Sequence, residues 1–482
     1  MKNKSFFLIS AAVLLALSAC GKNNNNNNTG GGGNGGGNGG SDAYIPEPYV
    51  DPEVNLSDAA TPNMEISFDK VTDTCMINKQ AKAYIDAMEE QEKTIAKPYH
   101  FSSLYGPDDY AYLAGKADTD DKHSDYAEVD TGGVDVCQYL KNTDDSGYCK
   151  NYPIQLTWDD DGSFADAKVK FWSKEDRSDI RETSVSVSNG KVTASLENLF
   201  RATKYRVQVF NGDDVSNSYE FKTGDYPRTM SFGGIKNVRD IGGFVTSYGV
   251  RTNQGLIYRG YYIDDGNPSS HGKNYNDETQ RVQEEVMKIG LELDLQKSSE
   301  TGGRTKSAIS TADMPVDYKC LTLVSYENFL KQDSFKNLPE VMHLLAQADE
   351  THVYFHCWGG ADRTGVTGFL LLGILGATYT DAIIDFELTT LCNNKRCHMH
   401  NSSNAHFPKF LKIFTSEYKF TRDGQEYTYT FDEDATFNTN ATNLLLAMGI
   451  ELETIEQIRT IMIPGYEAGV TEEHELENKG WH

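Results

Sequence analysis

The feature that most constrains the fold is a buried strand, a glycine-containing loop and a helix that follow one another in the sequence. The strand is expected at His352–His356 (HVYFH), whose apolar centre suits burial on both faces. The helix is expected from Arg363 to Leu375, and Gly376 ends it. A strand that leads through a short loop into a helix is typical of α/β folds, in which helices cover a sheet.

Helix and strand patterns alternate over the whole region 228–482. We expect a strand that ends at Tyr258-Arg259-Gly260 and another at Leu291–Leu295. Four further helices are expected: Asp277–Ile289, which Gly290 ends, Leu338–Ala348, Asp381–Leu391 and Thr454–Met462. The region is therefore predicted to form an α/β domain, with a central sheet flanked by helices.

Short strands with alternating apolar residues precede this domain. Ile154–Trp158 and Tyr205–Val209 alternate, and Asn189-Gly190 separates two further alternating runs, which is a strong signal for a β-hairpin. This spacing predicts an antiparallel β-sandwich over residues 151–225. The stretch LFRATKYRVQVF is similar to the tyrosine-corner strand of fibronectin type III domains. We interpret the acidic run Asp159–Gly162 as a turn rather than a calcium loop.

The chain begins with the pattern of a secretory signal. Lysines precede an apolar run, Phe6–Leu17, that is too short to span a bilayer. The run ends in Leu17-Ser18-Ala19-Cys20, which resembles a bacterial lipoprotein cleavage box and implies removal of residues 1–19 and lipid attachment to Cys20. The alternative is an ordinary secretory signal with a coincidental cysteine. The Asn- and Gly-rich residues 20–43 are expected to form a flexible tether.

Residues 44–150 form an acidic accessory region to which the sequence assigns no role. Within it, Asn78–Glu92 has a helical pattern. Its apolar stripe consists of Ala81, Tyr84, Ile85 and Met88.

The chain contains eight cysteines, and an extracytoplasmic address permits disulfides. Cys137 with Cys149, and Cys392 with Cys397, are close enough in sequence to pair, although sequence alone does not fix the pairing. Three histidines lie near the second pair: His398, His400 and His406. Their spacing fits none of the usual closed zinc sites, so we expect a loop there and no metal.

The charge of the chain restricts its partners. Lys and Arg number 45 against 71 Asp and Glu, which gives a formal net charge of −26 and argues against a nucleic-acid partner. One stretch departs from this trend, because Arg228–Gly260 holds five basic residues and one acidic residue (5 − 1 = +4). We expect this stretch to supply a small cationic site inside an acidic surface.

The loop after the strand carries the chemistry. Cys357 precedes Arg363 by six positions, and glycines lie between them. Backbone N–H groups at a helix start favour a dianion, an arginine matches two phosphate oxygens, and this positive field lowers a thiol pKa. We expect His356 to orient the loop and Thr364 to donate to the sulfur. The expected phosphate-binding residues are Trp358, Gly359, Gly360, Ala361, Arg363 and Thr364.

The pattern H-C-x5-R-[ST]-G resembles the phosphate loop of cysteine-dependent protein tyrosine phosphatases. HCWGGADRTG resembles in particular the bacterial tyrosine/serine phosphatase subgroup, and Asn237–Gly260 (NVRDIGGFVTSYGVRTNQGLIYRG) is similar to the N-terminal signature of that subgroup. The resemblance covers about residues 228–482 and implies a phosphocysteine intermediate without metal or cofactor. Two positions depart from it: Ala361 stands where the subgroup has Lys, and Gln296 where it has Arg. Both losses disfavour phosphoinositide substrates.

The general acid is less defined than the nucleophile. By resemblance we expect Asp362 to be the acid, with Asp264 or Asp265 as alternatives, whereas Asp240 is expected to anchor a turn. The remaining supporting residues are Arg239 and Arg259. The sequence does not decide whether they act in the site or have a structural role.

Together these features predict a bacterial lipoprotein outside the cytoplasm, at the periplasmic face or the cell surface. It is expected to hydrolyse a phosphorylated protein, phosphotyrosine first or with dual specificity, or a small phosphomonoester. One alternative is an inositol phosphate or phosphoinositide phosphatase. Another is a surface binding module in which the phosphatase domain is weak or inactive.

Overall fold

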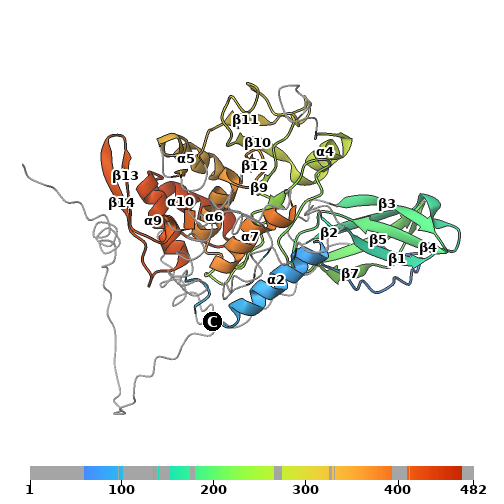
Figure 1. Cartoon of the computed structure of the whole chain (residues 1–482). Coiled ribbons are helices and arrows are strands. Elements are labelled where there is room, and N and C mark those ends of the chain that lie inside the picture. The colour runs from blue at the N-terminus through green and yellow to red at the C-terminus, as the bar shows by residue number, and fades with distance from the viewer. Residues whose placement is uncertain are drawn as a thin grey trace, which may run out of the picture. The chain divides into compact units, whose positions relative to one another are not determined.

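The computed structural model describes residues 59–468, apart from residue 96 and the segments 101–133, 135, 137–138, 140–150, 174–179, 265–273, 325–327, 330–331, 393–409 and 412. The described residues belong to one compact unit, Asp51–Ala468 (Figure 1). The predicted signal peptide, tether and lipidated Cys20 lie outside them, as does most of the accessory region. Among the helices that the structure describes, none is long and apolar enough to cross a membrane.

The accessory region contributes helix α2, Lys79–Glu92, as predicted. The Asn78 side chain caps its first turn by accepting a hydrogen bond from the Ala81 N–H at 2.6 Å. The predicted apolar stripe is buried. It belongs to the same hydrophobic core as helix α7, Tyr379–Cys392, so α2 is packed into the α/β part of the molecule.

An antiparallel sheet follows, with a hydrophobic core of its own. Its strands are β1 (Ile154–Asp159), β2 (Lys168–Ser173), β3 (Arg181–Ser188), β4 (Lys191–Leu196), β5 (Lys204–Asn211), β6 (Asp214–Val215) and β7 (Tyr219–Lys222). The predicted turn between β3 and β4 is confirmed, with Asn189 and Gly190 both at positive φ. The Tyr205 hydroxyl accepts a hydrogen bond from the Phe200 N–H at 2.8 Å, as in a tyrosine corner.

The strand pairing of this sheet is continuous. The order is β1-β4-β3-β2-β5-β6, with β7 also on β5. The first half of β3 pairs with β2 and its second half pairs with β4. Strand β3 therefore connects two groups of strands that would form separate sheets in a β-sandwich. The antiparallel arrangement is confirmed, and the two-sheet sandwich stays a prediction. In the acidic run, Asp160 and Asp161 accept backbone hydrogen bonds within a turn, as expected.

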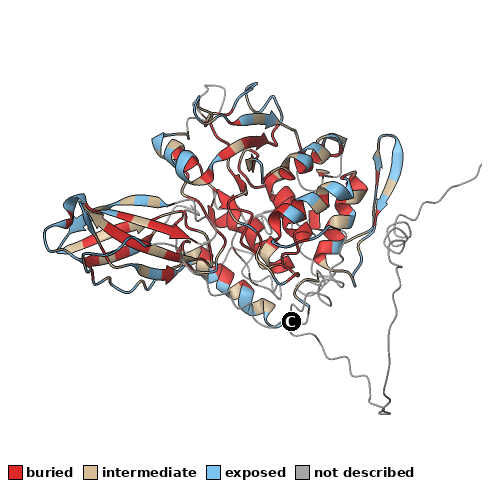
Figure 2. Cartoon of the chain, turned by 180° about the vertical axis from the view of Figure 1, so that it is seen from behind, coloured by how far each residue is buried: buried red, intermediate tan, exposed pale blue. Residues whose placement is uncertain are grey.

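The second sheet is mostly parallel, which confirms the α/β prediction. The helices and strands of this part are largely buried toward its centre (Figure 2). Its order is β11-β10-β12-β9-β8, and only β8 runs antiparallel to its neighbour. The strands are β8 (Arg239–Asp240), β9 (Ile257–Gly260), β10 (Ile289–Asp294), β11 (Asp317–Cys320) and β12 (His352–His356). The helices include α4 (Asp277–Val282), α5 (Gln332–Leu345), α6 (Arg363–Ile374), α7, α9 (Phe437–Met448) and α10 (Leu452–Met462).

The predicted helix Asp277–Ile289 is wrong at its C-terminal end. The α-helix stops at Val282, a π-helical turn continues to Met287, and Lys288 takes the left-handed conformation expected of Gly290. Ile289 already belongs to β10, because the buried Gln283 side chain hydrogen-bonds both its N–H and its carbonyl oxygen. A side chain thus ends the helix where the sequence suggested a glycine.

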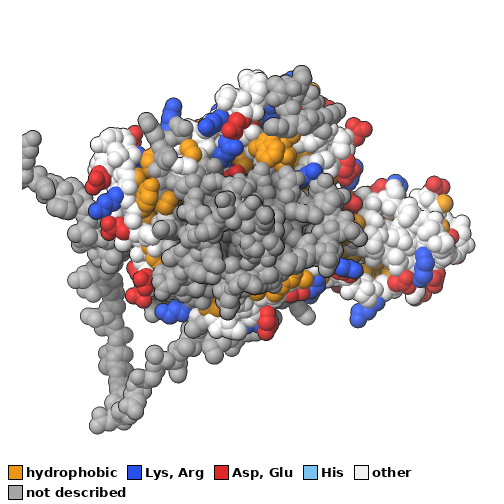
Figure 3. Space-filling view, in the orientation of Figure 1, with side chains coloured by type: hydrophobic (Ala, Val, Ile, Leu, Met, Phe, Trp, Pro, Cys, Tyr) orange, Lys and Arg blue, Asp and Glu red, His pale blue; other side chains and the backbone are white. Residues whose placement is uncertain are grey.

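Several elements of the α/β part were not predicted, including the short strands β8 and β11. The hairpin of β13 (Tyr418–Arg422) and β14 (Gln425–Tyr429) forms a separate two-stranded sheet, and α9 precedes α10. Helix α5 also begins earlier than expected, and Pro339 lies inside it. On the part of the described surface that Figure 3 shows, acidic and basic side chains are interspersed.

Candidate active site

The loop between β12 and α6 lies at the carboxyl edge of the parallel strands, where α/β proteins commonly place their sites. β12 is an inner strand, between β10 and β9. All residues of α6 after Arg363 are buried, so the helix start has a fixed position behind the loop. The predicted strand–loop–helix corner is therefore confirmed, and an anion in the loop would face the N-terminus of α6.

Cys357 is 2% exposed. Burial by itself raises the pKa of this thiol, but the positive charge of Arg363 and the hydrogen bonds of Thr364 outweigh burial and hold the pKa below its ordinary value. The Thr364 hydroxyl is buried, and it hydrogen-bonds no other oxygen or nitrogen in the part of the chain that the structure describes. Such a thiol is a better nucleophile near neutral pH than an ordinary cysteine.

Two side chains from outside the loop donate hydrogen bonds to its backbone carbonyl oxygens. The Asn237 amide donates to the Gly359 oxygen at 3.0 Å, and Arg259 Nη2 donates to the Gly360 oxygen at 2.8 Å. Gly360 has φ +64°, and a Cβ there would lie 2.3 Å from the Gly260 oxygen. No other residue fits this position without moving the backbone.

Arg239 and Arg259 are buried structural cations. Both side chains are 0% exposed and share Asp385 of α7, which Arg239 Nε reaches at 2.9 Å and Arg259 reaches through Nη1. Burial raises the pKa of Asp385, but the two arginines outweigh burial and lower it. Burial also lowers the pKa of Arg259 to about 10. Arg259 supports the loop through Gly360, and neither arginine is an open cation for substrate.

The expected cationic stretch is therefore wrong in one respect. Arg228 is also buried, and its Nη1 donates to Asp240 at 2.7 Å. Asp240 further accepts from the N–H groups of Gly242 at 2.8 Å and Gly255 at 2.7 Å, which confirms that it anchors the turn. Three of the five basic residues thus form buried internal ion pairs, because a buried charge needs a partner. A fourth, Arg251, pairs with the half-exposed Asp225 at 2.7 Å.

His356 connects the loop to a buried carboxylate. Its ring nitrogens lie 3.1 Å from the Cys357 carbonyl oxygen and 2.8 Å from Glu292 Oε1. Burial lowers the pKa of His356. Glu292 also binds Arg304 and Ser307. The expected orienting role of His356 fits this geometry, whereas Glu292 was missed, although a glutamate inside a strand expected to be buried is a usable signal.

Arg363 makes an ion pair that the sequence did not suggest. Its Nη1 lies 2.8 Å from Glu300 Oε2, with side-chain exposures of 13% and 40%. Its Nε is buried without a hydrogen-bond partner among the residues described. The donors that remain on this guanidinium suit a phosphate.

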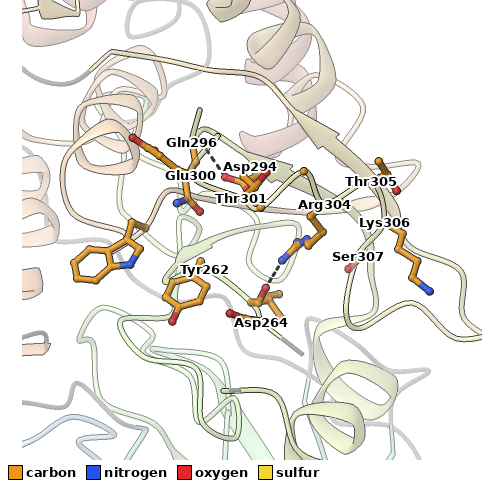
Figure 4. A pocket seen from close by; sticks show the side chains of 14 residues that line it. Tyr262, Asp264, Asp294, Gln296, Glu300, Thr301, Arg304, Thr305, Lys306 and Ser307 are labelled. Carbon is orange, nitrogen blue, oxygen red and sulfur yellow. Dashed lines mark hydrogen bonds between the residues drawn. The ribbon is translucent and has the colours of Figure 1, made fainter. Parts of the chain in front are cut away.

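A cavity of about 240 Å³ adjoins the loop at Trp358 (Figure 4). It is lined by Tyr262, Ile263, Asp264, Asp294, Gln296, Glu300, Thr301, Gly302, Gly303, Arg304, Thr305, Lys306, Ser307 and Trp358. The Tyr261 ring lies 5.7 Å from that of Trp358 and 4.7 Å from that of Tyr262. In Figure 4 the Lys306 side chain points away from Tyr262, whereas the Arg304 side chain points toward Asp264.

The candidate acids lie in different places. Asp264 is buried and lines the cavity, while Asp362 is partly exposed and immediately precedes α6. Asp265 lies outside the described residues. Gln296 lines the cavity, whereas Ala361 is buried in the loop and is not among the lining residues.

The remaining cysteine and histidine predictions are only partly covered. Cys392 is disulfide-bonded. Its predicted partner Cys397 is not among the described residues, nor are Cys137 and Cys149 or the three histidines named above. Within the described ranges no group of His, Cys, Asp and Glu could hold a metal ion.

Comparison with known families adds one finding. Residues 230–463 match the model of a family described as the tyrosine phosphatase family. The matched stretch contains the loop, both sides of the cavity and the Asp385 ion pairs. No curated protein matches the chain. The family match supports phosphatase activity in general for this part of the molecule.

Proposed function

We propose that the protein hydrolyses phosphomonoesters, phosphotyrosine first, through a phosphocysteine intermediate. The observation that carries this proposal is the buried Cys357 on a glycine loop at a helix start, with a thiol pKa that the charge of Arg363 helps to lower. The family match over residues 230–463 supports the same chemistry.

In the first step the Cys357 thiolate attacks phosphorus. An S–P bond forms and the P–O bond to the leaving group breaks, while Arg363 and loop N–H groups hold the other phosphate oxygens. The leaving oxygen takes a proton from a carboxylic acid. In the second step water attacks phosphorus, the same carboxylate takes its proton, and the thiolate leaves with the help of Thr364.

We assign the acid to Asp362, which adjoins Arg363 in the loop, and keep Asp264 as the alternative. Asp264 has the support of lining the cavity beside Trp358. An acid matters most when the leaving group is a poor one, since a weakly basic phenolate leaves without a proton. The two aspartates can therefore be separated by a series of leaving groups.

The cavity favours an aromatic leaving group over a polyphosphorylated one. Tyr262 and Trp358 offer ring surfaces, while the carboxylates in the lining, of Asp264, Asp294 and Glu300, outnumber the two cations, Arg304 and Lys306. Arg304 is already paired with Glu292. A second phosphate there would meet like charges. An inositol polyphosphate is therefore the less favoured substrate.

We further propose that a lipid on Cys20 holds the enzyme on a membrane, with the Asn- and Gly-rich residues 20–43 as the tether. Labelling of growing cells with a fatty-acid probe, with Cys20→Ser as control, tests the anchor.

The function is tested with purified protein and a panel of phosphotyrosine, phosphoserine and phosphothreonine peptides, phosphoinositides and inositol hexakisphosphate. Cys357→Ser is the control. If the wild-type protein hydrolysed p-nitrophenyl phosphate no faster than Cys357→Ser, the proposal would be wrong. Preference for inositol hexakisphosphate over phosphotyrosine peptides would overturn the substrate assignment.

A further inference from the structure

Resting on the proposed function, the geometry points to Glu300 as a positioning residue. We propose that it holds the Arg363 guanidinium so that its Nε and Nη2 edge faces the phosphate. Glu300 Oε2 binds Nη1, on the opposite side of the guanidinium from the edge that Nε and Nη2 share. A guanidinium has five N–H donors in one plane, so it can bind a carboxylate on one side and a phosphate on another.

The state of Nε supports this orientation. It is buried and has no hydrogen-bond partner in the described part of the chain. A buried donor without a partner is costly, and a bound phosphate oxygen would satisfy it. The hydrogen bond to Glu300 is therefore the contact that fixes the orientation of the Arg363 guanidinium before substrate binds.

Glu300 is itself held in place. Its Oε2 also accepts from the Lys297 N–H at 3.2 Å, and its own N–H donates to the Lys297 carbonyl at 2.7 Å. This tight turn directly follows the end of β10, where the Gln296 N–H donates to Asp294 at 2.9 Å. At the other end of the turn, Arg304 binds Glu292 beneath the loop. Because the turn that carries Glu300 is anchored at both ends, its carboxylate can hold the Arg363 guanidinium in one orientation.

The test measures phosphate affinity apart from turnover. Inorganic phosphate is titrated calorimetrically into Cys357→Ser alone and in combination with Glu300→Ala or Glu300→Gln. The p-nitrophenyl phosphate kinetics of the two single Glu300 variants are measured in parallel. The matched control is Glu278→Ala, which removes a carboxylate of similar exposure (42%) from an ion pair with Arg281 at 2.7 Å.

We expect Glu300→Ala to weaken phosphate binding about tenfold or more, the worth of a charged hydrogen bond. Glu300→Gln keeps an acceptor oxygen and should recover part of the loss. In the kinetics, the Glu300 variants should raise KM more than they lower kcat, and their thermal unfolding midpoints should be unchanged. The control Glu278→Ala should bind phosphate as tightly as its parent.

Two results would overturn the inference. Unchanged affinity in Glu300→Ala would mean that Arg363 needs no positioning, and tighter binding would mean that Glu300 competes with phosphate for the arginine. If Cys357→Ser binds phosphate but the wild type does not hydrolyse esters, the proposed function fails while the affinities still decide on Glu300. If Cys357→Ser binds no phosphate, both fail.

Discussion

Replacement of Asp385 by Asn tests whether the phosphate loop depends on a buried ion-pair cluster that substrate never touches. The Asp385 side chain is 1% exposed and serves two arginines, Arg239 and Arg259, that are 0% exposed. Asparagine keeps the shape but removes the charge, which leaves two buried guanidinium groups without a counter-ion. Arg259 in turn donates to Gly360 of the loop at 2.8 Å.

The expected loss follows from these contacts. Removing one partner of a buried ion pair costs about 3–5 kcal/mol, and folded domains are stable by only about 5–15 kcal/mol. Asp385→Asn should therefore lose about 3–5 kcal/mol in the free energy of unfolding and most of the activity. By contrast, Glu278→Gln in its exposed pair with Arg281 should lose less than about 1 kcal/mol.

The assay is equilibrium urea unfolding, followed by tryptophan fluorescence and circular dichroism. Since the pKa of folded Asp385 lies below the ordinary 3.8, its stabilisation is fully present above that pH. It is lost only as pH falls through the lower folded pKa, so the wild type and Asp385→Asn should converge only in strong acid. A loss below about 1 kcal/mol at pH 7 would refute the assignment of Asp385 as the required counter-ion of two buried arginines.

Four further predictions concern the site and the upstream sheet. Alkylation of Cys357 by iodoacetamide should reach half its maximal rate below the pH of an ordinary thiol, because the pKa of Cys357 is lowered; a midpoint at or above about 8.5 would contradict this. Gly360→Ala should abolish phosphate binding while the protein stays folded, since the new Cβ would lie 2.3 Å from a backbone oxygen; retained binding by calorimetry would argue against a fixed loop. Asp362→Asn should slow hydrolysis of phenyl phosphate far more than that of p-nitrophenyl phosphate, and the same asymmetry in Asp264→Asn instead would move the acid role. Tyr205→Phe should lower the free energy of unfolding by about 1 kcal/mol, and no change in urea unfolding would deny the corner hydrogen bond a stabilising role.

Much of the fold could be predicted from local sequence patterns. The apolar strand His352–His356, the helix from Arg363, the hairpin at Asn189-Gly190 and the stripe of α2 are all confirmed. In each case the signal lies within one element, since periodicity and turn residues report burial and backbone shape directly. The end of the helix at Lys288 was missed because the buried Gln283 side chain, not a glycine, ends it.

The sequence by itself determined the chemistry of the loop: a thiol, an arginine six positions later and glycines between them lie on one short segment. Only the tertiary structure decided what the other charges do. Arg239 and Asp385 are 146 positions apart, and Glu300 and Arg363 are 63 positions apart, yet each forms an ion pair. The physical reason is that a charge removed from water must find a partner, and the packing of the sheet and helices, rather than any local pattern, brings that partner within reach.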